Sequence, residues 1–147
     1  MADKLAKAKL ARAAHRLAAG RLPALVLMTD DERLPDPLSA ARALPRGSLV
    51  IVRSRDSARR QKLLFALKSI ARGRRLTILV ADDAAMARDA DGIHLPQIRA
   101  QQAAHWRALR PKWIITVAAH APWPRARHAD TVLLSPVFPT ASHPGAP

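Results

Sequence analysis

The chain contains six short apolar runs, and they restrict its fold more than any other feature. They are rich in Val, Ile and Leu and span Ala24–Thr29, Leu49–Arg53, Leu76–Ala81, Gly92–Leu95, Trp113–Ala118 and Thr131–Ser135. Most are continuous instead of alternating, the pattern of strands buried on both faces of a parallel sheet. They predict six strands of a parallel α/β fold, either a barrel or an open sheet, because periodicity does not separate the two.

Helices are expected between the runs. The clearest spans Ser57–Arg72, with Asp56 or Ser57 as its N-cap and Gly73 at its end. It gathers apolar side chains on one face, namely Leu63, Leu64, Leu67, Ile70 and Ala71. Weaker patterns predict further helices over Lys4–Ala19, Pro37–Leu44, Ala84–Asp89, Gln97–Leu109 and Pro122–Ala129.

The amino-acid composition excludes cysteine-based chemistry, but it does not identify the kind of molecule that the protein binds. The absence of cysteine excludes disulfides, thiolate catalysis and cysteine-bound zinc. The 147 residues include 25 Lys and Arg against 11 Asp and Glu, a net charge of +14. Such a charge attracts nucleic acid, anionic lipid or phosphorylated small molecules, and does not choose among them. Because the apolar stretches are too short to cross a bilayer, we expect no membrane span and a cytoplasmic protein.

Polar residues follow the predicted strands, at the carboxyl ends where parallel α/β proteins place their catalytic and ligand-binding residues. These positions hold Thr29–Asp31, Arg53–Asp56, Asp82, Asp83, His94, His120 and Ser135–Ala146. The chain has neither a G-x-G-x-x-G sequence after its first strand nor a G-x-x-x-x-G-K-[ST] loop. The open-sheet nucleotide-binding alternative is therefore disfavoured.

Four motifs in the same order resemble the thiamine phosphate synthase and thiazole tautomerase family. Ser135–Ala146, SPVFPTASHPGA, is similar to the family loop GPVFPTxTKxGA. Leu27–Asp30 resembles the first-strand LITD, Ala90–Gln97 resembles ADGVHLGQ, and Ile115–His120 resembles IGVSTH. The resemblance implies a (β/α)8 TIM barrel, here of about six βα units over residues 23–147. Residues 1–22 would form a basic helix that packs on the barrel and closes its bottom.

The resemblance also implies where ligands bind. Hydroxyl, imidazole and backbone groups of the last loop would hold a phosphate, namely Thr140, Ser142, His143 and Gly145. Arg53 and Arg55 match basic positions of the family's QLREK motif and would bind substrate, and both could instead be solvated charges at a helix entry. The expected partner is a phosphorylated thiazole or thiamine compound.

Departures from the family pattern affect pyrimidine and magnesium handling. Ile51 replaces the pyrimidine-reading glutamine, Ala81 an asparagine and Ala118 a serine. Asp82 matches one magnesium-binding aspartate and would bind substrate, whereas Arg99 occupies the place of the second. Magnesium binding at Asp82 is therefore disfavoured. The alternatives are that Asp82 pairs with an arginine or caps the next helix.

His120 remains, and the resemblance implies that it transfers a proton in a tautomerase. The alternative is a hydrogen-bonded strand-end histidine without chemistry. His94, by contrast, is predicted to be a satisfied core residue.

Three functions stay open. The first is a thiamine enzyme, either a synthase-like transferase or, as the departures favour, a thiazole isomerase. The second is a degenerate binding or regulatory protein on the same scaffold, and the third is a basic nucleic-acid-associated protein, which the absence of a recognition motif disfavours. Because no seventh and eighth units follow the phosphate loop, we expect compromised catalysis, with the chain truncated or its open edge covered by a second copy.

Overall fold

The computed structural model describes residues 8–10, 12–13, 22–120 and 126–136. The chain divides into two compact units, Met1–Val80 and Ala81–Pro147. Both units alternate parallel strands with helices, as the apolar runs predict.

The first unit is built on the strands β1 (Val26–Met28), β2 (Leu49–Val52) and β3 (Thr77–Ala81). They are parallel, and Val50 of β2 faces Leu27 on one side and Ile78 on the other. Val50, Ile51 and Val52 have no exposed surface. Burying a side chain of this kind contributes about 1.5–3 kcal/mol, so β2 is the centre of this unit's core. The continuous apolar run correctly predicted burial on both faces.

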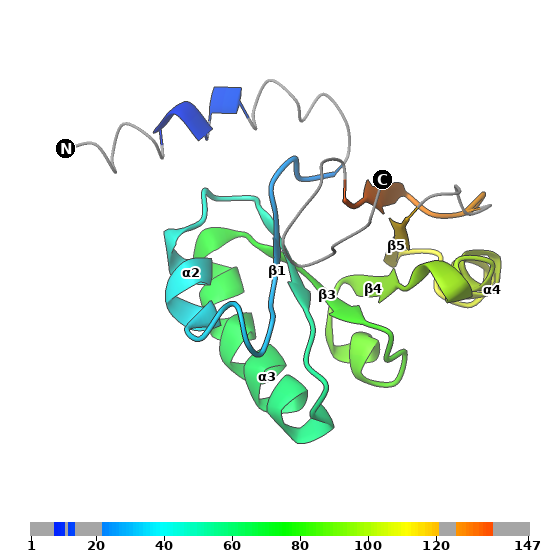
Figure 1. Cartoon of the computed structure of the whole chain (residues 1–147), viewed down its shortest axis with the longest axis horizontal. Coiled ribbons are helices and arrows are strands. Elements are labelled where there is room, and N and C mark those ends of the chain that lie inside the picture. Colours follow the sequence, from blue (N-terminus) through cyan, green and yellow to red (C-terminus); the bar gives the residue numbers. More distant parts are fainter. Residues whose placement is uncertain (1–7, 11, 14–21, 121–125, 137–147) are drawn as a thin grey trace. The chain divides into compact units, whose positions relative to one another are not determined.

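Two helices of the first unit, α2 (Pro37–Ala43) and α3 (Ser57–Arg74), lie side by side (Figure 1). Asp36 caps α2, and its carboxylate accepts from the backbone N–H of Ser39. Asp56 caps α3 and accepts from the N–H groups of Ala58 and Arg59 at 2.8 and 3.1 Å. These bonds satisfy donors that a helix start leaves free.

The end of α3 differs from the prediction, because the helix runs through Gly73. Its C-cap is Arg75, which adopts the left-handed conformation at φ 52° and donates its backbone N–H to Ala71. The contacts of Arg74 explain the two extra residues. Its guanidinium donates to the carbonyl of Leu44, and its own carbonyl accepts from Gly47, so both ends of Arg74 are fixed.

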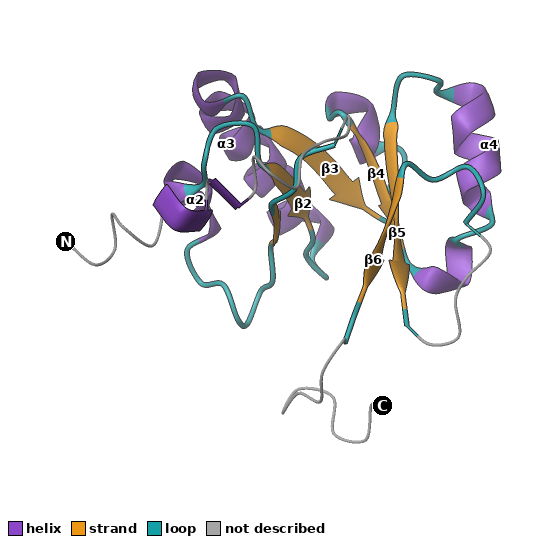
Figure 2. Cartoon of the chain, turned by 90° about the horizontal axis from the view of Figure 1, so that it is seen from above, coloured by secondary structure: helices purple, strands orange, loops and turns teal. Residues whose placement is uncertain are grey.

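The second unit contains the strands β4 (Gly92–Leu95), β5 (Ile114–Ala119) and β6 (Thr131–Leu134). They are parallel, with Ile93 opposite Ile115 and Val117 opposite Val132. The helix α4 (Gln102–Leu109) packs against β5 (Figure 2). A Cβ added to Gly92 would meet the carbonyl oxygen of Ile114 at 1.9 Å, so β4 starts where only glycine lets the two backbones approach.

Three helix predictions in this unit need correction. The stretch Gln97–Leu109 is divided into a 3₁₀ helix η2 (Gln97–Arg99) and α4, because Arg99 and Ala100 donate to carbonyls three residues back. Ala84–Asp89 forms only a 3₁₀ helix, η1 (Met86–Asp89). Of Pro122–Ala129, the described residues 126–129 form a turn in which the N–H of Ala129 donates to Ala126.

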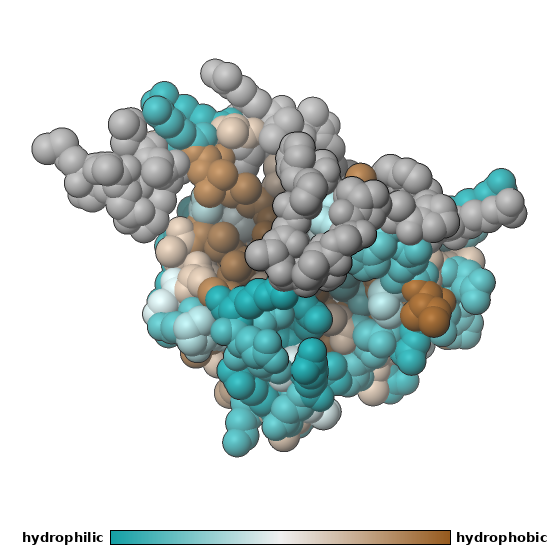
Figure 3. Space-filling model, viewed as in Figure 1, coloured by the Kyte–Doolittle hydropathy of each residue, from teal (hydrophilic) through white to brown (hydrophobic). Residues whose placement is uncertain are grey.

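On the face seen in Figure 3, the lower part of the described surface is mostly hydrophilic, and a hydrophobic region lies above it toward the upper left. In the stretches that the structure describes, no helix is long and apolar enough to cross a membrane. Residues 8–10 and 12–13 are helical, and the rest of the predicted helix Lys4–Ala19 lies outside the described residues. Its packing on the barrel stays a prediction.

Candidate functional site

In the first unit, Thr29 joins the carboxyl ends of β1 and β2. Its side chain is 1% exposed. The hydroxyl donates to the carbonyl of Arg53 and accepts from the N–H of Arg53, both at 2.8 Å. This reciprocal pair fixes the two strand ends together, so that the residues after Thr29 face the residues after β2.

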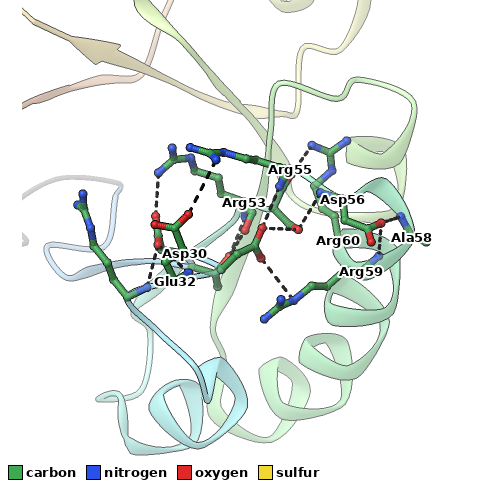
Figure 4. Close-up of polar contacts among 12 residues, drawn as sticks. Asp30, Glu32, Arg53, Arg55, Asp56, Ala58, Arg59 and Arg60 are labelled. Carbon is green, nitrogen blue, oxygen red and sulfur yellow. Dashed lines mark hydrogen bonds and ion pairs between the residues drawn. The ribbon is translucent and has the colours of Figure 1, made fainter.

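Asp30 is the first of these facing residues. One carboxylate oxygen accepts from the backbone N–H groups of Arg33 and Glu32, at 2.9 and 3.1 Å. The other lies 3.3 Å from the guanidinium of Arg53 (Figure 4). The two backbone donors, with help from the Arg53 charge, hold the pKa of Asp30 below its usual range. Asp30 is therefore an anion near neutral pH.

Asp31 links the β1 end to the start of α3. One oxygen accepts from the N–H of Arg55 at 3.1 Å and from the hydroxyl of Ser54 at 2.9 Å. The other lies 3.4 Å from the guanidinium of Arg59. The Arg55 amide is the main cause of the lowered pKa of Asp31, and the Ser54 hydroxyl adds to it. Asp31 therefore holds the loop that carries Arg53 and Arg55.

Both arginines predicted to bind substrate have an acidic neighbour. Arg53 pairs with Asp30, and Arg55 lies 3.9 Å from Glu32 with 89% of its side chain exposed. The pair of Arg55 is long and exposed, so it holds that side chain weakly. A phosphate would meet carboxylates as well as guanidinium groups here. The substrate role of Arg53 and Arg55 stays a prediction.

In the second unit, Asp82 follows β3 and pairs with Arg99 of η2. The carboxylate and the guanidinium are 2.8 Å apart, with the side chains 39% and 50% exposed. Asp82 is in the left-handed conformation at φ 53°, and its backbone N–H donates to His94 at 2.9 Å. The arginine pairing that the sequence offered as an alternative is therefore present.

The Asp82 position does not fit Mg²⁺. This ion needs hard oxygen ligands, and the group beside the carboxylate is a guanidinium, which carries only N–H donors. Over the parts of the chain that the structure describes, no three His, Asp or Glu side chains gather as a metal site. The residues around Asp82 therefore do not form a magnesium site.

His94 is 6% exposed, and its Nδ1 lies 2.8 Å from the hydroxyl of Thr116 on β5. The prediction of a satisfied core histidine is confirmed.

His120 follows β5 and is exposed. Its backbone N–H donates to the side-chain oxygen of Gln97, and its ring Nδ1 contacts the carbonyl of Ser135. The N–H of Ser135 in turn donates to Ala119 at 3.0 Å. The imidazole is thus held against the first residue after β6.

The predicted phosphate ligands Thr140, Ser142, His143 and Gly145 lie outside the described residues. The segment that leads to them is described as far as Pro136, and it leaves β6 beside His120. The proposed proton-transfer group therefore stands where the predicted phosphate loop begins.

Several residues that position these groups were not predicted. Gln97 and Ser135 both lie within matched motifs, so the motifs contained the signal without assigning a role. Asp30 and Asp31 were recognised only as polar strand-end residues. Their partners Arg53 and Ser54 lie 23 residues away in sequence, and only the parallel pairing of β1 and β2 brings them together.

A search for related proteins finds a family model and curated relatives. The model for thiamine monophosphate synthase matches residues 25–147. A thiamine-phosphate synthase of Aromatoleum aromaticum is 34% identical over 140 residues, covering 86% of this chain and 66% of that protein. A relative from Aquifex aeolicus is 29% identical over 136 residues, covering 85% of this chain and 73% of its own length. The chain thus spans about two thirds of the Aromatoleum relative.

Among solved structures, the thiamine phosphate pyrophosphorylase from Pyrococcus furiosus is similar, with a TM-score of 0.56 and 19% identity. The match covers 79% of this chain and 61% of that one. At this identity the likeness concerns the fold, and it supports the expected barrel-family α/β class over an open nucleotide-binding sheet. With the family model matched over 25–147, the chain belongs to the thiamine monophosphate synthase family.

Proposed function

We propose that the chain acts in thiamine biosynthesis or salvage by binding a phosphorylated thiazole or thiamine compound, on which His120 moves a proton. Family membership supports the pathway and the ligand class. The observation that carries the proposal is the contact of the His120 ring with Ser135, where the predicted phosphate loop begins.

This contact determines which ring nitrogen acts. The Ser135 carbonyl can only accept a hydrogen bond, so Nδ1 must carry a proton to bind it. In the neutral imidazole, Nε2 is then the basic nitrogen. An imidazole can take up and release a proton near neutral pH, which suits the removal and return of a proton.

The positions that differ from the family pattern favour isomerisation over synthase chemistry. Joining a pyrimidine diphosphate to a thiazole phosphate requires recognition of the pyrimidine and handling of diphosphate charge. Ile51 is fully buried and apolar, and Arg99 pairs with Asp82. Isomerisation of a thiazole phosphate needs only a phosphate cradle and a proton-transfer group.

The test is an assay of proton exchange. The full chain would be incubated with a phosphorylated thiazole tautomer in D₂O, and deuterium incorporation would be followed by NMR. We expect His120→Ala to lower the exchange rate about 10²–10⁴-fold, the usual contribution of a general acid–base group. His128→Ala removes an exposed histidine before β6 and is the matched control. Unchanged exchange in folded His120→Ala would remove His120 from the mechanism.

The second candidate is a non-catalytic binding protein. The Asp82–Arg99 pair favours it, because Arg99 stands where the synthases carry their second magnesium-binding aspartate. Ligand binding without deuterium exchange by the unmodified chain would select this candidate. A third outcome, nucleic-acid binding that weakens steeply between low and moderate salt without thiazole phosphate binding, would replace both.

A further inference from the structure

We infer that Arg99 acts as a built-in cation beside Asp82, so that this strand edge binds phosphate groups without a divalent metal. The inference deepens the proposed function, because it states how a phosphorylated ligand would be held. It starts from the Asp82–Arg99 pair, at 2.8 Å.

The backbone fixes both partners. Asp82 follows β3 in the left-handed conformation, which is uncommon for residues other than glycine, and its N–H is bonded to His94. Such conformations cluster at functional sites. Arg99 ends η2, where its N–H donates to Pro96. The carboxylate and the guanidinium therefore project from anchored positions at the end of β3 and after β4.

The pair neutralises itself, which changes what the site can bind. A carboxylate alone attracts a divalent cation, but here a positive charge already occupies the place at its side. Mg²⁺ would have to displace a guanidinium and would then gain only a single carboxylate. The local charge therefore disfavours a metal.

The same geometry favours an anion. A guanidinium has five N–H donors in a planar fork, and the bond to Asp82 uses one nitrogen, Nη1. Half of the Arg99 side chain is exposed. Ion pairs this exposed are weak, so an incoming phosphate can share the guanidinium or take it from Asp82.

Gln97 connects this edge to the proposed base. It stands two residues before Arg99 in η2, and its side chain accepts from the backbone N–H of His120. A phosphate held by Arg99 would therefore bind to the same short helix that positions His120.

The experiment uses two probes, pyrophosphate for the anion and Mn²⁺ for the metal, with the full chain and three variants. Arg99→Gln removes the charge, and Arg99→Asp creates a pair of carboxylates. Lys112→Asp makes the same charge change as Arg99→Asp at an exposed position of the same unit. Pyrophosphate binding would be measured by calorimetry without metal, and Mn²⁺ binding by electron paramagnetic resonance. Circular dichroism would verify that each variant is folded.

We expect the unmodified chain and Lys112→Asp to bind pyrophosphate without metal. Arg99→Gln should weaken that binding about tenfold or more, because a charge-assisted hydrogen bond is lost. Arg99→Asp should bind Mn²⁺ at least about tenfold more tightly than the unmodified chain, because two carboxylates can then share the ion. The inference would be overturned if Arg99→Gln kept full pyrophosphate affinity or if Lys112→Asp lost as much of that affinity as Arg99→Gln. Equal Mn²⁺ affinity of Arg99→Asp and the unmodified chain would also overturn it.

This result is separable from the proposed function. If the Arg99 variants behave as expected while a phosphorylated thiazole does not bind the unmodified chain, the anion site stands and the thiazole proposal is wrong. If the thiazole compound binds equally to the unmodified chain and to Arg99→Gln, the proposed function stands and the role of Arg99 is refuted.

Discussion

Asp130 offers a quantitative test of how the second unit holds β6 beside β5. One of its carboxylate oxygens accepts from the backbone N–H of Ile115 at 2.7 Å and from the guanidinium of Arg107 at 2.6 Å. The same guanidinium donates to the carbonyls of Pro111 and Trp113, both at 2.9 Å. Asp130 thus connects the residue before β6 to β5 and to the connection after α4.

The cost of Asp130→Ala follows from these contacts. Ile115 has no exposed surface, so its N–H would lose its partner in a buried place, at about 1–3 kcal/mol. The pair with Arg107 is partly exposed, 35% for Asp130 and 28% for Arg107, and adds about 0.5–1 kcal/mol. We expect a loss of about 2–4 kcal/mol in the free energy of unfolding, or about 5–15 °C in melting temperature.

Asp130→Asn separates the two contributions. The amide oxygen can still accept from Ile115 but lacks the charge that attracts Arg107, so we expect a loss of only about 0.5–1 kcal/mol. Urea unfolding followed by circular dichroism measures both variants. Asp89→Ala, which removes an exposed aspartate at the end of η1, is the control. If Asp130→Ala loses no more stability than Asp89→Ala, the assigned role of Asp130 is wrong.

Two further predictions concern the backbone contact at β4 and the acid dependence of the first unit. Gly92→Ala would place a Cβ 1.9 Å from the Ile114 carbonyl oxygen, so it should prevent a cooperative urea transition; a normal transition would refute the close approach of β4 and β5. Asp31 has a folded-state pKa below its ordinary 3.8, mainly through the Arg55 amide, so its stabilisation is present above that value and is lost as pH falls through the folded pKa. The free energy of unfolding of Asp31→Asn should therefore fall less between about pH 5 and pH 3 than that of the unmodified chain. Parallel profiles of unfolding free energy against pH for the two proteins would contradict this.

The strands could be predicted because burial on both faces leaves a strong signal. β2 consists of four apolar residues in a row, and all four are buried. The helix limits were less accurate where tertiary contacts decided them. Gly73 is the residue that local preference selects to end α3, but the bonds of Arg74 to Leu44 and Gly47 extend the helix to the following left-handed Arg75.

The sequence predicted which residues belong to the site, but only some of the partners that those residues contact. His120 and Asp82 could be selected from the matched motifs. The acceptor of the His120 ring could not be, because Ser135 approaches it only through the pairing of β5 with β6. Arg53 was predicted to bind substrate, and its neighbour in the structure is Asp30. The sequence does not indicate how strongly Asp30 would compete with a ligand for this guanidinium. Local motifs indicate which residue types lie at a strand end, whereas the pairing register of neighbouring strands determines which residues they contact.

The most direct test of ligand binding is a calorimetric titration of the full chain with a phosphorylated thiazole, with and without magnesium. We expect saturable one-to-one binding that is the same in both conditions and that raises the melting temperature, because the ligand binds only the folded state. Binding that appears only when magnesium is added would contradict the metal-independent site. No binding at millimolar ligand by a chain that melts cooperatively would contradict the account as a whole.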